Sequence, residues 1–453
     1  MANGYNGWTA IAFVINCMLG SGINYMPAVF NNSGIVLGIG ILFIVGCLTT
    51  FSIYALFRCC FKSEAFLDNV EYGGLGKLKY KHLGIVIEFT LLIASILSAL
   101  GFQKYASELI TIFISRFYSI ESPSFTRCLN VVVLMATTLI LTGLSMIQNL
   151  KRFKILSYLS VFCIFSLMVI LTFLNISIPN LSSYTSVSET SSIDFNFILS
   201  FCILAMSVQA NIPYLYTKLE NITKSLLLFI AALSSFVGFM VYGLAGVLGS
   251  KLTGSSIGHN DIIKYFLDKN SALNLYIANN NDLNPSFSNL LVGLILYQSL
   301  CAIVILISGF PLQLAPAVRF FKKYLPFKNA NISSTHNIIV LILLTFLTLI
   351  NMIPNLSLNL IFELLGPTAI GFLCYFFPFL LYYAYAEDKS KFKKMLALLI
   401  MLFSVIYSIY GVTCAIKKAL HESEYDGKKN NLIDFEYYAE QLNSTTIASP
   451  TIN

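Results

Sequence analysis

The sequence predicts an all-α, polytopic membrane protein with eleven transmembrane helices, and three observations support this. Only 11% of its 453 residues are charged and 57% are hydrophobic, whereas a soluble globular chain is about 25% charged. The mean hydropathy is +0.77. The apolar residues gather into runs of roughly 20 residues, the length at which a helix crosses a bilayer. We therefore expect the lipid bilayer to surround this chain.

Eleven apolar runs are long enough to span the membrane, and polar connections separate them. We expect the spans at about 8–30, 34–57, 83–115, 128–146, 153–174, 195–217, 225–249, 287–318, 337–353, 357–385 and 393–416. Residues 417–453 are polar and form a C-terminal tail. The spans make a single membrane domain over residues 1–416.

The net charge of +7 does not indicate nucleic-acid binding, because the basic residues lie mostly in short loops between the apolar runs. In such loops Lys and Arg set the orientation of the chain in the membrane. With a cytoplasmic N-terminus, the inside loops hold about twice as many Lys and Arg as the outside segments. We therefore predict a cytoplasmic N-terminus and an external or lumenal C-terminus.

The first span is interrupted at its centre. It contains Gly20, Ser21 and Gly22, with Pro27 five residues later, and both glycine and proline weaken a helix. Backbone freed at membrane depth is tolerated only where it is buried in protein or lines a cavity. We predict a broken helix whose loosened turn, with Asn24 beside it, holds a small ligand. Close helix packing at the glycines and a simple proline kink are the alternatives.

The sixth span is interrupted in the same way, by Ser207, Gln209, Asn211 and Pro213. The two breaks occupy matching places in a repeat of five plus five spans, about 8–174 and 195–385, with 393–416 as an extra helix. Interrupted spans at matching places indicate a transport site at the repeat interface. Helix N-termini there attract a carboxylate, while free carbonyls accept from an ammonium. An amino acid carries both groups on one carbon.

Two carboxylates within the spans, Glu88 and Glu363, are candidates for proton coupling, because burying a charge at membrane depth costs about 2.5–3.5 kcal/mol. A buried carboxyl with a raised pKa can carry a proton through a transport cycle. The alternatives are that Glu88 faces headgroups near the cytoplasmic end and that Glu363 is a structural partner of freed backbone. Lys104 and Glu108, four residues apart, predict a local ion pair.

Several motifs in this order resemble the amino acid/auxin permease family, which includes the sodium-coupled neutral and the vacuolar amino acid transporters. The motifs are AIAFVINCMLGSGINYMPAVFNNSGIVLGI in span 1, PYLYTKLENITKS and YGLAGVLGS around spans 6 and 7, FPLQLAPAVR in span 8, and ELLGPTAIGFLCYFFPFLLYY in span 10. The resemblance covers about residues 8–416.

The resemblance implies an inverted-repeat fold of the amino acid/polyamine/organocation type and transport by alternating access. Asn16 stands where the sodium-coupled members place a sodium-binding asparagine, and Ser308 lies near the position of its hydroxyl partner. Span 6 lacks the Cys-His of those members, and Asn24-Tyr25 replaces the small or apolar pair that usually follows the glycines. Sodium and proton coupling both stay open, as do the plasma membrane and a vacuole- or lysosome-like membrane.

We therefore predict a secondary active amino acid transporter, a symporter or antiporter driven by a proton or sodium gradient. Gly20, Ser21, Gly22, Asn24, Ser207, Gln209 and Asn211 would bind the substrate, and Asn16 and Ser308 the ion. The alternative is a non-transporting amino acid receptor on the same fold. The sequence has no nucleophile–base constellation and no metal motif, so we expect no enzymatic activity, and no cofactor apart from the coupling ion.

Overall fold

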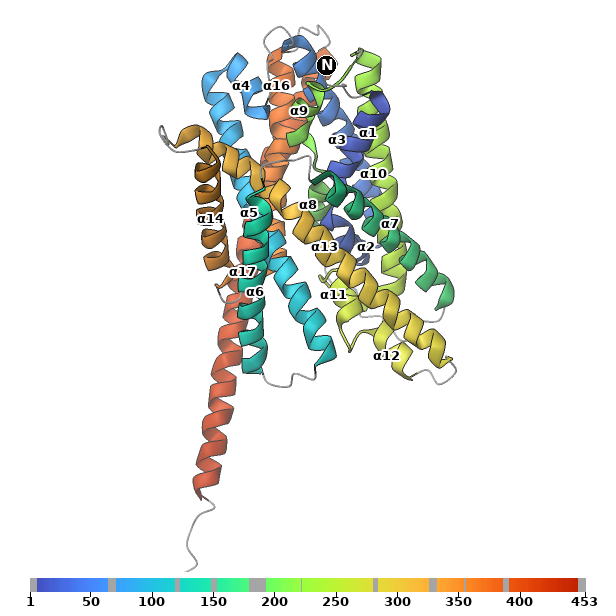
Figure 1. The fold of residues 1–453 in the computed structure, drawn as a ribbon, viewed down its shortest axis with the longest axis vertical. Coiled ribbons are helices and arrows are strands. Elements are labelled where there is room, and N and C mark those ends of the chain that lie inside the picture. Colours follow the sequence, from blue (N-terminus) through green and yellow to red (C-terminus); the bar gives the residue numbers. More distant parts are fainter. Residues whose placement is uncertain are drawn as a thin grey trace, which may run out of the picture.

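The computed structural model describes residues 6–63, 71–118, 123–147, 153–178, 193–220, 222–279, 284–325, 332–353, 356–385 and 391–446. Within these ranges the chain folds as a bundle of helices (Figure 1). The described residues include ten helices long and apolar enough to cross a membrane, or eleven when the bent first pair counts as one span. The predicted fold class is confirmed.

The first five spans correspond closely to the predicted runs. They are formed by α1 (Gly7–Met18), η1 (Ser21–Tyr25) and α2 (Met26–Ser33), then α3 (Ile35–Ser63), α5 (Lys81–Phe117), α6 (Pro123–Ser145) and α7 (Phe153–Ser177). A short helix that the sequence did not predict, α4 (Tyr72–Lys79), precedes α5.

The next five spans repeat this order. They are formed by α8 (Phe195–Ala205), η5 (Gln209–Asn211) and α9 (Ile212–Tyr216), then α10 (Lys224–Thr253), α13 (Pro285–Tyr324), α14 (Ile332–Asn351), and α15 (Leu358–Leu365) with η7 (Gly366–Ile370), η8 (Phe372–Phe376) and α16 (Phe377–Tyr385). Three short elements connect α10 to α13, namely η6 (Gly254–Ile257), α11 (Ile262–Leu267) and α12 (Ala272–Asn279).

The short connecting helices show that the second half is inverted relative to the first. α4 follows the second span of the first half at one end of the molecule, whereas α11 and α12 follow the second span of the second half at the opposite end (Figure 1). The two longest helices of the halves, α5 and α13, occupy corresponding places and pack against each other.

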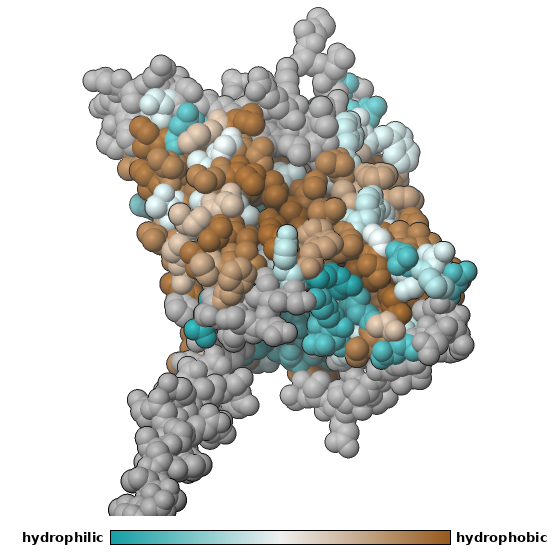
Figure 2. Space-filling model, turned by 60° about the horizontal axis from the view of Figure 1, so that its bottom comes forward, coloured by the Kyte–Doolittle hydropathy of each residue, from teal (hydrophilic) through white to brown (hydrophobic). Residues whose placement is uncertain are grey.

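The flank of the molecule is apolar. Figure 2 shows mainly hydrophobic residues along the flank and polar residues gathered at the end where α11 and α12 lie. Large apolar side chains such as Val36, Leu139 and Ile176 are among the most exposed in the described chain. A water-soluble protein would bury such residues, whereas here they face lipid.

Helix α10 holds the first span in place. A Cβ atom on Gly246 would lie 2.6 Å from the Phe30 ring, and one on Gly249 would lie 2.2 Å from Pro27 Cγ. Only glycine permits this approach, so the glycine-rich sequence of span 7 brings α10 against α2. The packing fixes the position of the broken turn that precedes α2.

The last helix, α17 (Lys391–Thr446), lies outside the two repeats. Its span covers Lys391–Leu420, close to the predicted 393–416. The helix then continues through the polar tail as far as Thr446 and projects from the end at which α11 and α12 lie (Figure 1).

Candidate substrate and ion site at the two broken helices

The first break lies between α1 and η1, and the axis of the span bends there by 55°. The Tyr242 hydroxyl on α10 donates to the Met18 carbonyl oxygen at 2.7 Å and accepts from the Gly20 amide at 3.4 Å. One phenol therefore satisfies a carbonyl and an amide that the helix no longer pairs. Without such a partner, each freed group would be costly at membrane depth.

The glycines of this break have different surroundings. A Cβ atom on Gly20 would meet no heavy atom within 4 Å, so the space beside this peptide is open. A Cβ on Gly22 would lie 3.3 Å from Ala205 Cα and Cβ. Ala205 is the last residue of α8, so the first break packs directly onto the second. The first N–H groups of η1 have no partner within their own helix and form the positive end of its dipole.

The second break lies between α8 and η5, and Gln209 is its buried polar residue, 1% exposed. Gln209 Oε1 accepts from the Val208 amide at 2.8 Å and from Cys374 Sγ at 2.9 Å. Its Nε2 is buried and has no hydrogen-bond partner among the described residues. Buried donors are nearly always paired in native proteins, so this amide is a donor available to a bound ligand.

The other predicted residues of the second break are less central. The Ser207 hydroxyl is half-buried and donates to the Leu204 carbonyl at 2.7 Å. Asn211 is exposed. The structure therefore places Gln209 in the interior and Asn211 at the surface, and the substrate role of each stays a prediction.

A third irregular segment lies in the tenth span, where η7 and η8 are π-helical. Backbone carbonyls in and beside these π-turns accept hydrogen bonds from hydroxyl groups of other helices. The Ser52 hydroxyl donates to the Cys374 carbonyl, the Tyr72 hydroxyl to the Leu373 carbonyl at 2.9 Å, and the Ser404 hydroxyl to the Gly371 carbonyl at 3.2 Å. Such π-turns are frequent at functional sites. This irregularity was not predicted from the sequence, although the glycines at 366 and 371 are a signal for it.

An aromatic cluster surrounds the end of the first break. The Tyr25 ring stacks on Phe201 with centroids 4.4 Å apart and contacts Tyr105 and Phe362 at 5.9 and 5.8 Å. Asn24 Nδ2 donates to the Tyr105 hydroxyl at 3.2 Å, and both residues are buried. Asn24 and Tyr25 thus join the broken turn to α5, α8 and α15.

The predicted ion ligands lie on different helices. The Ser308 hydroxyl on α13 lies 3.0 Å from the Ser160 hydroxyl on α7 and donates to the Ile305 carbonyl at 3.0 Å. Asn16 is half-buried on α1. No hydrogen bond joins Asn16 to Ser308 in the described part of the chain, so their pairing at a sodium ion stays a prediction.

Glu88 forms an ion-pair cluster at the end of the molecule where α4 lies. Its carboxylate is 2.8 Å from Lys77 Nζ, 2.7 Å from Lys323 Nζ and 2.6 Å from the Tyr324 hydroxyl. Glu88 is 7% exposed. The cluster ties α4 and α5 to the end of α13, and the proton role of Glu88 stays a prediction.

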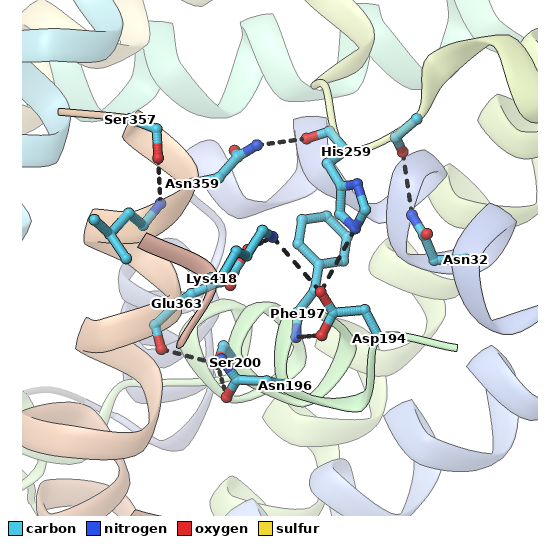
Figure 3. Close-up of polar contacts among 12 residues, drawn as sticks. Asn32, Asp194, Asn196, Phe197, Ser200, His259, Ser357, Asn359, Glu363 and Lys418 are labelled. Carbon is cyan, nitrogen blue, oxygen red and sulfur yellow. Dashed lines mark hydrogen bonds and ion pairs between the residues drawn. The ribbon is translucent and has the colours of Figure 1, made fainter. Parts of the chain in front are cut away.

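Glu363 forms a second cluster at the other end (Figure 3). Lys418 Nζ on α17 lies 2.6 Å from Glu363 Oε1 and 3.6 Å from Asp194 Oδ2, and His259 Nε2 lies 3.7 Å from Asp194 Oδ2. Burial alone would raise the pKa of the Asp194 carboxyl. The facing His259, the Phe197 amide and Lys418 outweigh burial and lower this pKa to about 2. The cluster joins α8, α15, α17 and the connection before α11.

Comparison with solved structures supports this architecture. MhsT in complex with L-phenylalanine shares 11% sequence identity with the chain and superposes with a TM-score of 0.55, covering 90% of this chain and 98% of that one. A mutant of the Eremococcus coleocola manganese transporter shares 13% identity with a TM-score of 0.51, covering 90% of this chain and 87% of that one. At these identities the similarity shows the fold alone.

Comparison with the curated proteins gave no significant match. The family model described as transmembrane amino acid transporter protein matches residues 4–417, which is nearly the whole chain. This confirms the resemblance noted in the sequence and agrees with a multi-pass integral membrane protein that is not an enzyme. The chain belongs to the transmembrane amino acid transporter family.

Proposed function

We propose that this transporter moves amino acids by secondary active transport, with the substrate held between the two broken helices and its movement coupled to a proton or sodium gradient. The observation that supports this most directly is the contact of the two breaks at Gly22 and Ala205. The first break also has open space at Gly20, and the second break carries the buried, unpaired amide of Gln209. The two half-helix ends thus meet, and each break offers room or a free donor to a ligand.

The chemistry of the breaks fits a zwitterion. The Ser21 and Gly22 N–H groups at the start of η1 would hold the substrate carboxylate, because the helix dipole favours an anion there. The open space at Gly20 would admit it. The Gln209 amide would donate to the same group. Freed carbonyls at the ends of α1 and α8 would accept from the ammonium. Asn24, Ser207 and Asn211 complete the proposed substrate set. The sodium ligands predicted from the sequence are Asn16 and Ser308, and the predicted proton carriers are Glu88 and Glu363.

The proposed orientation places the N-terminus and α4 in the cytoplasm, with α11, α12 and the C-terminus external or lumenal. It rests on the Lys and Arg bias of the loops. The ends of the molecule at which α4 and α11 lie are opposite in Figure 1, as this orientation requires. The membrane would be the plasma membrane or a vacuole- or lysosome-like membrane.

A proteoliposome uptake screen tests the function. The purified protein would be offered each of the twenty amino acids under an imposed proton gradient, an imposed sodium gradient, or neither. We expect at least one amino acid to accumulate under one of the gradients. Specific binding without flux under any gradient would contradict transport and would support the alternative, an amino acid receptor on the same fold.

Removing the Tyr242 hydroxyl tests the broken turn itself. Tyr242→Phe would leave the Met18 carbonyl unpaired in a buried site, which costs about 1–3 kcal/mol. We expect uptake at low substrate concentration to fall roughly tenfold, since about 1.4 kcal/mol is a factor of ten. Tyr383→Phe, at a tyrosine that is 53% exposed, is the matched control and should transport normally. Equal uptake by the two variants would exclude this role for Tyr242.

A further inference from the structure

Asp261 is a buried carboxylate outside the residues predicted from the sequence. It lies just before α11 and is 0% exposed. Its Oδ1 caps the helix by accepting from the Ile263 amide at 2.9 Å and the Lys264 amide at 3.0 Å. Its Oδ2 is also buried and makes no hydrogen bond of normal geometry within the described chain. Capping therefore uses one oxygen, and the Tyr105 hydroxyl is the side-chain donor that faces the carboxylate.

The charged and titratable groups that face Asp261 come from α11, α5 and η1. Lys264 is the nearest cation, but its Nζ lies 2.7 Å from Glu108 Oε2, and Lys104 lies 3.6 Å from the same carboxylate. Tyr105 and Tyr25 face Asp261 from the aromatic cluster. Both lysines thus form ion pairs with Glu108, and Asp261 makes no ion pair with any described residue.

The other helices packed on α11 add no charge. α13 carries no charged residue between 285 and 318, and Lys251 at the end of α10 is exposed. Burial raises the pKa of Asp261 above its ordinary value, although Lys264, the Tyr105 hydroxyl and the two capping amides act against this. The surroundings of Asp261 therefore favour the neutral carboxyl more strongly than water around an exposed aspartate does.

Asp261 is also connected to the broken turn. The Tyr105 hydroxyl that faces it accepts from Asn24 in η1. The connection that carries Asp261 is itself fixed to the first and tenth spans, because Asn32 donates to the Gly258 carbonyl and Asn359 to the His259 carbonyl, each at 3.1 Å (Figure 3). A change at Asp261 can therefore reach the turn through Tyr105.

The two carboxylates predicted from the sequence differ from Asp261 in that each has an ammonium partner. Glu88 has Lys323 at 2.7 Å and Glu363 has Lys418 at 2.6 Å. An ammonium at hydrogen-bond distance stabilises the charged carboxylate and opposes protonation. Neither has a hydrogen bond to η1 among the described residues.

We propose that Asp261 binds the coupling proton of this transporter, an inference that rests on the proposed transport function. A proton from water on the α11 side forms an O–H bond with Oδ2, and it returns to water when the carboxyl ionises in another step of the cycle. A neutral carboxyl is a weaker acceptor for the Tyr105 hydroxyl than a carboxylate is. Proton occupancy would thereby alter the hydrogen bond that Tyr105 makes with Asn24 at the substrate turn.

The test compares two modes of transport in proteoliposomes containing wild-type protein or Asp261→Asn, with an amino acid that the wild type takes up. Asparagine is as good a helix cap as aspartate, so the fold should be kept. We expect proton-driven accumulation to fall at least tenfold. Exchange of internal unlabelled for external labelled substrate, without any gradient, should stay within about twofold because it needs no net proton movement.

Asp268→Asn is the matched control, because Asp268 is exposed seven residues further along the chain. It should retain both modes. Accumulation by Asp261→Asn at the wild-type level would overturn the proposal, and so would equal loss of both modes in a variant with wild-type thermal stability. If Asp261→Asn fails to fold, Tyr105→Phe replaces it and should weaken the dependence of uptake on the proton gradient; an unchanged dependence would overturn the proposal.

The same measurements separate this inference from the proposed function. A wild-type protein that neither accumulates nor exchanges any amino acid contradicts transport itself. A wild-type protein that exchanges substrate and accumulates it only under a sodium gradient keeps the transport function and overturns the role of Asp261.

Discussion

Gly22→Val is expected to abolish amino acid uptake, lowering it at least a hundredfold, while the protein still inserts into the membrane. The first added carbon would lie 3.3 Å from Ala205 Cα and Cβ, and valine adds two further methyl groups with little rotamer freedom. The atoms it meets are backbone atoms of Ala205 and its Cβ, which the backbone fixes, so no flexible side chain can move aside. The two half-helix ends would be forced apart, and the substrate would lose the groups between them.

The measurement is labelled uptake in proteoliposomes, with insertion checked by protein yield and size-exclusion behaviour. Gly293→Val is the control, because a Cβ at this exposed position meets nothing within 4 Å. It should insert and transport like the wild type. Normal uptake by Gly22→Val would contradict a site at the contact of the two breaks.

Lys418→Met is expected to have the largest effect on stability. It would leave the Glu363 carboxylate, 1% exposed, without its ammonium partner. Breaking a fully buried ion pair costs about 3–5 kcal/mol, and because the Lys418 side chain is 30% exposed the loss here should be smaller, about 2 kcal/mol. The melting temperature in detergent should fall by about 2 °C.

A double variant separates charge from packing. Lys418→Met with Glu363→Gln removes both charges, and we expect it to regain most of the lost stability, as buried pairs replaced together usually do. Lys417→Met, at the exposed neighbouring position, should leave the melting temperature unchanged. If the double variant is no more stable than Lys418→Met, the ion pair is not the source of the loss.

Glu363→Gln alone also tests the predicted proton role of Glu363, since a proton carrier would lose gradient-driven accumulation.

The spans and the first break could be predicted because their signals are local. A run of apolar residues such as 225–249 must cross the bilayer whatever surrounds it, and α10 covers it. Glycine and proline in mid-span disfavour a continuous helix at the positions they occupy. The break after Met18 therefore follows from the residues at that position alone.

The partners of the charged residues could not be predicted, because they come from distant parts of the chain. Lys104 and Glu108 do approach within 3.6 Å as their spacing predicts, yet the nearer partner of Glu108 is Lys264 on α11. Glu363 meets Lys418 from a helix outside both repeats. Such pairs depend on how helices pack, and helix spacing predicts only contacts within a helix.

The short helices and Asp261 were missed for a related reason. α4, α11 and α12 are each eight residues or fewer, too short to show a membrane-length apolar run or several turns of periodicity. The only local signal at Asp261 is an aspartate directly before the apolar stretch 262–267, which is typical of a helix cap. A cap is usually exposed, and only the packing of α11 on α5 shows that this one is buried.

The position of Lys418 near the C-terminal end of the last span has a practical consequence for protein engineering. A chain truncated at residue 416, where the apolar sequence ends, would keep every predicted span and still delete the cation that neutralises Glu363. Shortened versions for crystallisation or fusion should therefore end beyond Leu420, and affinity tags belong after Thr446, where they extend α17 without disturbing its contact with the tenth span.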